Sequence, residues 1–185
     1  MMRSTPREER GAVLIAALVL LVVLTLLGLS AMQNTTLEER MAGNLRSENA
    51  AFQAAETALR AGESWIGALF VKPVADANGS NGVWLLDAPD ADADDDQAWW
   101  RQRDASWWSS YADAVGTSTL AYGPDLNLDV LPRYLIEERG VVRDTLNLGQ
   151  QNDFVGRPYY QITARGTGMG GQPAVILRST YSRRY

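Results

Sequence analysis

The chain has 185 residues, a formal net charge of −5, a sequence pI near 4.8 and 46% hydrophobic residues. It contains no cysteine and no histidine, which excludes disulfides, thiol catalysis, histidine-activated nucleophiles and the common zinc sites. An acidic chain also lacks the basic stripe of a general nucleic-acid surface. The short basic cluster of Arg178, Arg183 and Arg184 is ordinary for the solvated end of a strand. This length suits one membrane helix and one folded domain.

The first predicted element is an apolar helix near the N-terminus. No charged residue occurs in residues 11–37, and residues 12–33 are mostly Ala, Val, Leu and Ile. At about 1.5 Å of rise per residue, this helix spans roughly the 30 Å hydrocarbon core of a bilayer. Three arginines precede it, Arg3, Arg7 and Arg10, and they favour a single pass with a cytoplasmic N-terminus. A cleaved secretory signal ending near residues 28–30 is disfavoured, because its apolar region should be only about 7 to 15 residues long.

The same helix is predicted to continue through residues 34–66 as an amphipathic segment, since no proline occurs in residues 12–72. Apolar residues recur there at helical spacing on one face, which we expect to pack on the sheet with Phe52 as a large buried aromatic residue: Leu37, Met41, Leu45, Phe52, Ala55, Leu59 and Ile66. Gly28 and Gly43 are candidate bend points. Glu48 falls on this apolar face. One interpretation is that its long side chain reaches the edge of the face or forms an ion pair with an arginine of the domain. The other interpretation is that Glu48 contacts a neighbouring subunit.

Residues 67–128 are predicted to form an irregular insertion of helix and loop. Its acidic run, residues 87–96, contains no basic residue and is interpreted as a solvated loop that leads into a helix N-terminus. Asp90, Asp92 and Asp94 remain a weak alternative as a calcium site. The EF-hand pattern fails there, because Asp95 and Arg101 stand at its glycine and glutamate positions.

A tryptophan-rich helix is predicted within residues 97–115. One helical face carries its large apolar residues, which are interpreted as core: Trp100, Trp107, Trp108, Tyr111 and Val115. Trp99 falls on another face. If Trp99 is exposed, it is a candidate anchor for a partner subunit.

Residues 129–185 are predicted to form an antiparallel sheet. Strand-like alternation occurs in residues 130–140, 157–166 and 173–181, and a glycine-rich connector suited to a hairpin occupies residues 167–172. Residues 83–86 form a short apolar run that suits an edge strand. The pattern therefore predicts an α+β fold, in which a long N-terminal helix, membrane-spanning in its first half, packs on an antiparallel sheet of three to five strands.

Several segments resemble a known family. The junction of residues 10–15, Arg-Gly-Ala-Val-Leu-Ile, resembles the processing site of type IV prepilins. Residues 36–44 and 51–56, TLEERMAGN and AFQAAE, resemble the N-terminal region of PilX-type minor pilins, and residues 160–168 resemble a strand and turn common in that group. The resemblance implies a pilin fold and a leader of residues 1–11. It also implies cleavage between Gly11 and Ala12 by a prepilin peptidase, with methylation of the new amine.

The chain departs from the family pattern at Ala16. Most pilins carry glutamate at this fifth position after the cut, and its partner in the fibre is taken to be the free amine of the preceding subunit. A carboxylate at the bilayer centre costs about 2.5–3.5 kcal/mol without a partner. Ala16 therefore suits a founding or tip subunit that has no predecessor, although alanine also simply packs well in an apolar helix.

The resemblance implies a minor pilin that primes or caps a type IV pilus, first in the bacterial inner membrane and then on the cell surface. Its implied partners are the other minor pilins, the major pilin, the prepilin peptidase, the inner-membrane assembly platform and a tip adhesin. A type II secretion minor pseudopilin is the alternative, followed by a signal-anchored periplasmic protein. No spacing of carboxylates and serines singles out a catalytic pair, so we expect neither an enzyme nor a cofactor.

Overall fold

The computed structural model describes residues 8–92, 95–116, 130–143 and 156–185. Its residues fall into two compact units, Met1–Leu45 and Arg46–Tyr185. The long helix α1 begins in the first unit and ends in the second, and each unit is described by itself below.

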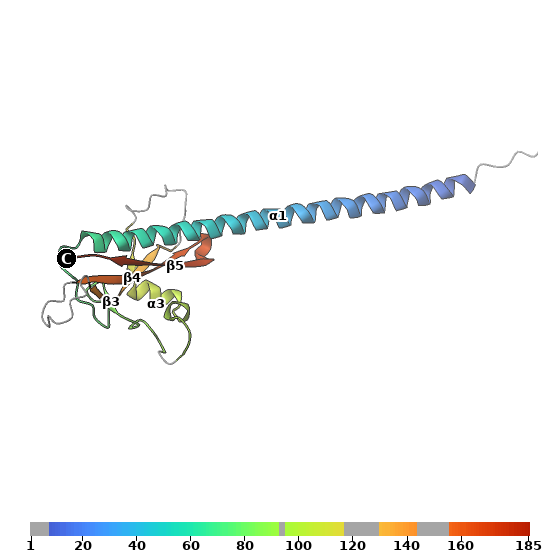
Figure 1. The fold of residues 1–185 in the computed structure, drawn as a ribbon. Coiled ribbons are helices and arrows are strands. Elements are labelled where there is room, and N and C mark those ends of the chain that lie inside the picture. Colours follow the sequence, from blue (N-terminus) through green and yellow to red (C-terminus); the bar gives the residue numbers. More distant parts are fainter. Residues whose placement is uncertain (1–7, 93–94, 117–129, 144–155) are drawn as a thin grey trace, which may run out of the picture. The chain divides into compact units, whose positions relative to one another are not determined.

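Helix α1, Glu8–Ala68, has 61 residues and corresponds to the long helix that the sequence predicts (Figure 1). The helix continues without a break through the two predicted bend points, Gly28 and Gly43. A proline-free sequence rich in alanine and leucine favours this continuity, because both residues rank high in helix propensity. The chain leaves the helix after Ala68 and reaches Pro73 five residues later.

The second unit contains a five-stranded sheet in the order β1-β3-β4-β5, with β2 also paired to β3. Its strands are β1 (Trp84–Leu85), β2 (Asp113–Ala114), β3 (Arg133–Arg143), β4 (Gly156–Thr167) and β5 (Ala174–Ser182). The three long strands pair antiparallel, whereas β1 pairs parallel to β3 at the edge of the sheet. The three predicted long strands and the predicted edge strand are thus confirmed, and the insertion contributes β1 and β2.

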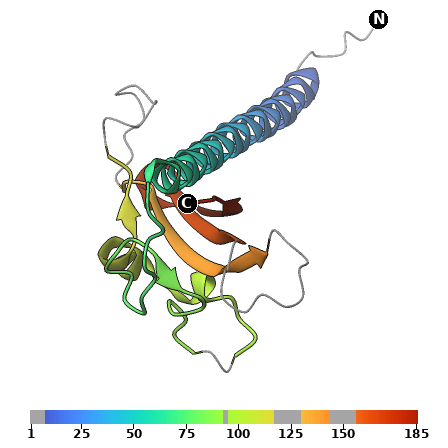
Figure 2. The same ribbon diagram turned by 60° about the vertical axis from the view of Figure 1, so that its left-hand side comes forward.

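Both faces of the sheet are covered in the second unit. Tyr134 and Ile136 of β3 belong to a core with Ala58, Leu59 and Ile66 of α1. On the opposite face, Leu135 packs in a second cluster with the buried tryptophans of the insertion. Figures 1 and 2 show the second half of α1 along one face and α3 (Ala105–Tyr111) beyond the other. The sheet therefore has two cores, one on α1 and one on the insertion.

Small residues set the distance between α1 and the sheet. Ala51, Ala55 and Ala58 are 0% exposed on the inner face of α1. A Cβ added at Gly166 of β4 would lie 2.3 Å from the carbonyl oxygen of Ala51 and from the amide nitrogen of Ala55. Only a glycine fits this contact, since real Cβ atoms do not approach backbone so closely. The helix consequently lies directly against the backbone of the central strand.

The tryptophan-rich segment differs from the prediction of one helix in residues 97–115. It forms two short helices, α2 (Trp99–Gln102) and α3, separated by extended backbone at Arg103 and Asp104. Asp104 ends the break, because its side chain accepts a hydrogen bond from the Trp107 amide at 2.8 Å and caps α3. This break turns Trp99 inward, to 2% exposure, beside fully buried Trp108. The hypothesis that Trp99 anchors a partner is therefore wrong.

Candidate assembly helix and interaction surfaces

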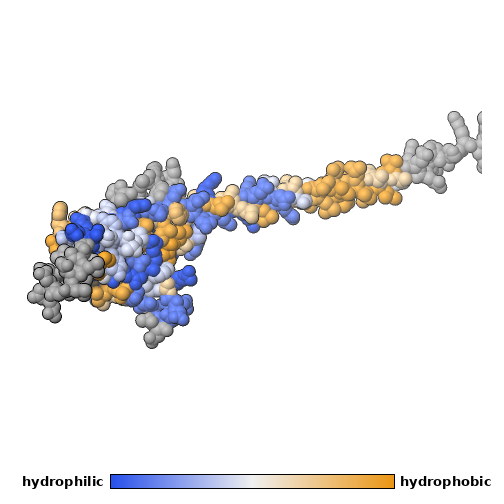
Figure 3. All heavy atoms as spheres, viewed as in Figure 1, coloured by the Kyte–Doolittle hydropathy of each residue, from blue (hydrophilic) through white to orange (hydrophobic). Residues whose placement is uncertain are grey.

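The first unit presents an apolar helical surface. The large apolar side chains of residues 13–32 are 45–72% exposed (Figure 3). Helix α1 also contains an 18-residue window with a mean hydropathy of 3.1, none of it buried within the structure. Every backbone amide and carbonyl of a helix interior is already bonded, so such a surface is compatible with lipid or with other apolar helices.

The predicted processing site, Gly11 and Ala12, lies inside the assigned helix. A Cβ added at Gly11 would meet nothing within 4 Å. Packing within the chain therefore does not require glycine there, even though glycine in a helix costs about 1 kcal/mol relative to alanine. Ala16 lies one turn further on, in a hollow between the larger side chains of Val13 and Leu20.

The apolar stripe of residues 37–66 divides into an exposed part and a buried part. Ala55, Leu59 and Ile66 are buried on the sheet, as predicted. Four members of the stripe are instead 47–67% exposed: Leu37, Met41, Leu45 and Phe52. The expectation that Phe52 packs in the core is wrong because alanines occupy the centre of the buried face and leave Phe52 at its edge. The turn between β4 and β5 meets α1 at Ser47, whose hydroxyl donates to the Gln172 carbonyl oxygen at 3.0 Å.

Glu48 is exposed on α1. Among the described residues it forms no ion pair, in contrast to Arg60, which pairs with Glu63 at 3.0 Å. The interpretation of Glu48 as the partner of a domain arginine is therefore not supported. Its contact with a neighbouring subunit stays a prediction.

The acidic run folds into local turns rather than a ligand cluster. Asp90 Oδ1 accepts a hydrogen bond from the Asp92 amide at 3.1 Å, and Asp95 Oδ1 accepts one from the Gln97 amide at 2.8 Å. Asp94, the third residue of the alternative calcium site, lies outside the described residues. In the part of the chain that the structure describes, no group of three acidic side chains is placed to hold a metal ion.

A buried carboxylate that the sequence pattern did not indicate joins the insertion to the sheet. Glu137 of β3 is 0% exposed. Its side chain accepts hydrogen bonds from Trp99 Nε1 and from the Asp87 amide, both at 3.2 Å. Arg178 of β5 lies 3.6 Å from Glu137 Oε2 and stacks over Trp100, 3.6 Å from its ring centroid. Burial raises the pKa of Glu137 above its ordinary value, against the opposing effect of the Asp87 amide and Arg178.

An apolar helix that continues into a helix-on-sheet domain defines a membrane-anchored, pilin-like subunit. Residues 10–60 match the PilX N-terminal family, and residues 71–183 match the family described as type IV pilus assembly protein PilX C-term. The chain therefore belongs to the PilX family, a structural family of type IV pilus assembly, and is a minor pilin of this type. No curated protein and no solved structure matches it significantly.

Proposed function

We propose that this minor pilin primes or caps assembly of a type IV pilus. It is inserted in the inner membrane with its N-terminus in the cytoplasm, and a prepilin peptidase cleaves it between Gly11 and Ala12. The observation that carries the proposal is the exposed apolar surface of α1, which runs through residues 13–32 and continues at Leu37, Met41 and Leu45. Exposed apolar surface of this extent marks an interaction site.

The chemistry at Ala16 supports a founding or tip position. Residues 11–37 carry no charge, so this helix brings no carboxylate to the amine of a preceding subunit. Within the fibre, a subunit without this carboxylate would lack the ion pair with the amine of the subunit before it. A founding subunit has no subunit before it, so it loses nothing by lacking the carboxylate. The absence of a charge also removes the cost of about 2.5–3.5 kcal/mol for an unpaired carboxylate in lipid.

Glycine at position 11 supports processing there. It is not required by packing within the chain, because a side chain at Gly11 would meet no atom within 4 Å. A requirement from outside the chain, such as the narrow cleft of a peptidase, accounts for it. The other minor pilins, the major pilin, the assembly platform and a tip adhesin are the partners that this role implies.

The role is tested by counting surface pili in a strain that lacks this protein and is complemented with variants. Deletion should sharply lower the number of pili while the major subunit remains abundant in the inner membrane. Ala16→Glu should give no gain in pili. Ala17→Glu is the matched control, because it places the same carboxylate one residue away. Near-normal piliation in the deletion strain would contradict priming. A gain with Ala16→Glu alone would place the subunit within the shaft.

A further inference from the structure

A shallow hollow lies on the surface of the insertion. Its volume is about 470 Å³, and it is lined by residues 102–104 and by Ser106, Trp107, Ser110 and Tyr111 of α3. Small-molecule sites commonly have volumes of about 300–1,000 Å³. The proposed role in pilus assembly uses none of these residues, so the hollow needs its own explanation.

The aromatic ring of Tyr111 lines the hollow and packs against two tryptophan rings. Tyr111 stacks on Trp107 with ring centroids 5.3 Å apart and planes at 29°. The Trp84 ring meets Tyr111 edge-on at 6.3 Å and 72°. These contacts hold the ring in place, yet Tyr111 remains 56% exposed. Tyr111 therefore lines the hollow as an exposed aromatic side chain that is packed against two tryptophans.

The rim of the hollow carries one positive and one negative group, both held in position. Arg103 donates from Nε to the Pro89 carbonyl oxygen at 2.8 Å, and its guanidinium carbon lies 4.8 Å from the Trp107 ring centroid. Asp104 accepts hydrogen bonds from the Trp107 amide and the Ser106 hydroxyl, both at 2.8 Å. These bonds lower the pKa of Asp104, so its carboxylate is ionised at neutral pH.

An aromatic ring, one positive group and one negative group in the lining together limit the class of ligand that fits the hollow. The opposite charges of Arg103 and Asp104 lie on adjacent residues, so the lining of the hollow has no net charge that would favour a cation or an anion. A wholly apolar ligand would cover both charges without offering them hydrogen bonds, which is unfavourable. A ligand that fits has no net charge, an apolar flat face for Tyr111 and hydroxyls at its edge that can both donate and accept.

We propose that the hollow binds a neutral sugar in its pyranose form. The C–H face of the sugar ring stacks on Tyr111, since the face of an aromatic ring carries the negative part of its quadrupole and attracts polarised C–H groups. The sugar hydroxyls donate to the carboxylate of Asp104 and accept from the guanidinium of Arg103. Ser110 also lines the hollow.

The proposal is tested by titration calorimetry on the full chain, purified in lauryldimethylamine oxide because a detergent with a sugar headgroup would compete. The probes are maltotriose, lactose and N,N′,N″-triacetylchitotriose. At least one should bind with a dissociation constant below about 10 mM. Tyr111→Ala should weaken that binding at least about tenfold, whereas Tyr111→Phe keeps the ring and should stay within about twofold of the wild type.

Two further variants keep the result interpretable if Tyr111→Ala unfolds. Ser110→Trp starts from an exposed position, fills the hollow and should abolish binding. Phe70→Ala removes a 93% exposed aromatic residue outside the hollow and should leave binding unchanged. The proposal is overturned if none of the three probes binds at about 10 mM, or if Ser110→Trp binds as the wild type does. Binding is measured without pili, so its failure leaves the proposed role in assembly untouched.

Discussion

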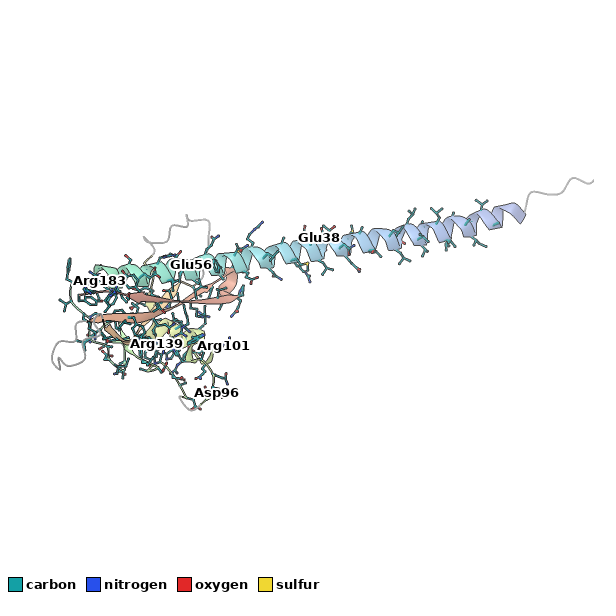
Figure 4. The ribbon with its side chains drawn as sticks, viewed as in Figure 1. Glu38, Glu56, Asp96, Arg101, Arg139 and Arg183 are labelled. Carbon is teal, nitrogen blue, oxygen red and sulfur yellow. The ribbon has the colours of Figure 1, made fainter. Side chains whose placement is uncertain are left out.

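Arg183 donates a hydrogen bond from Nη1 to the carbonyl oxygen of Ile66 at 2.7 Å, and a second to the carbonyl of Gly67. Figure 4 shows Arg183 beside the end of α1. The last turn of α1 contains no basic residue, so the cation beside its carbonyls and the negative end of its dipole comes from Arg183, near the C-terminus of the chain. The residue that directly follows β5 is thereby bonded to the C-terminal end of α1.

Replacing Arg183 by alanine should lower the free energy of unfolding of the second unit by about 1–2 kcal/mol, because the helix carbonyls lose a charged donor. The measurement is urea unfolding of a fragment that begins at Asn34, which we expect to be soluble and monomeric. Arg101→Ala is the matched control, since Arg101 is exposed in the insertion. Equal midpoints for the two variants would show that the contact contributes nothing measurable.

Gly166→Ala should destabilise the same fragment by about 1–3 kcal/mol or more. The added methyl group would lie 2.3 Å from backbone atoms of α1, which cannot move without separating helix and sheet. Gly43→Ala serves as the control. Its Cβ meets nothing within 4 Å, so it should leave stability unchanged or raise it by up to about 1 kcal/mol through helix propensity. Thermal unfolding distinguishes the two, and equal melting temperatures would contradict the close contact.

Glu137 should make the stability of the second unit depend on pH. Its pKa in the folded protein is raised by burial, so the protonated carboxyl is the form that folding favours. That contribution is complete below the ordinary pKa of about 4.3 and is lost as the pH rises through the raised value. Unfolding free energies of wild type and Glu137→Gln should therefore diverge above about pH 4.3, with the wild type declining relative to the variant. Parallel profiles would show that Arg178 compensates the charge completely.

Phe52→Ala should change the stability of the fragment by no more than about 0.5 kcal/mol, because Phe52 lies at the exposed edge of the helix. Leu59→Ala, on the buried face, should cost about 2–5 kcal/mol. In the cell, the stable Phe52→Ala variant should still lower the number of surface pili, because that side chain is available to neighbouring subunits. Full piliation with Phe52→Ala would remove this residue from the assembly surface.

The sequence predicts the elements well where one periodicity runs undisturbed. The uninterrupted helix pattern predicts α1, and the alternation at Tyr160, Ile162 and Ala164 predicts the face of β4 that the structure buries completely. The sequence pattern is less informative where small residues decide the packing. The alanines around Ala55 have small apolar side chains, yet they form the inner face of α1. The sequence pattern therefore wrongly predicts that the larger Phe52 packs in the core.

The remaining differences come from contacts between distant segments. A helical wheel drawn through residues 97–115 ignores the break at Arg103 and therefore misplaces Trp99. Asp104 was the available signal, since an aspartate three residues before Trp107 is a typical N-cap. The buried position of Glu137 had no comparable signal, because its partner Arg178 lies on another strand and the pair meets only in the folded sheet.

The most direct test of the account is intact-mass and peptide analysis of pili sheared from cells. We propose that the protein is cleaved after Gly11 and enters the fibre. We predict a low-abundance component whose N-terminal peptide begins at Ala12 with a methylated amine, and we predict that replacing Gly11 by a bulky residue leaves the uncleaved precursor in the membrane and out of the sheared fraction. Retention of residues 1–11 in the mature protein, or a mature N-terminus at Ala31, would contradict the account.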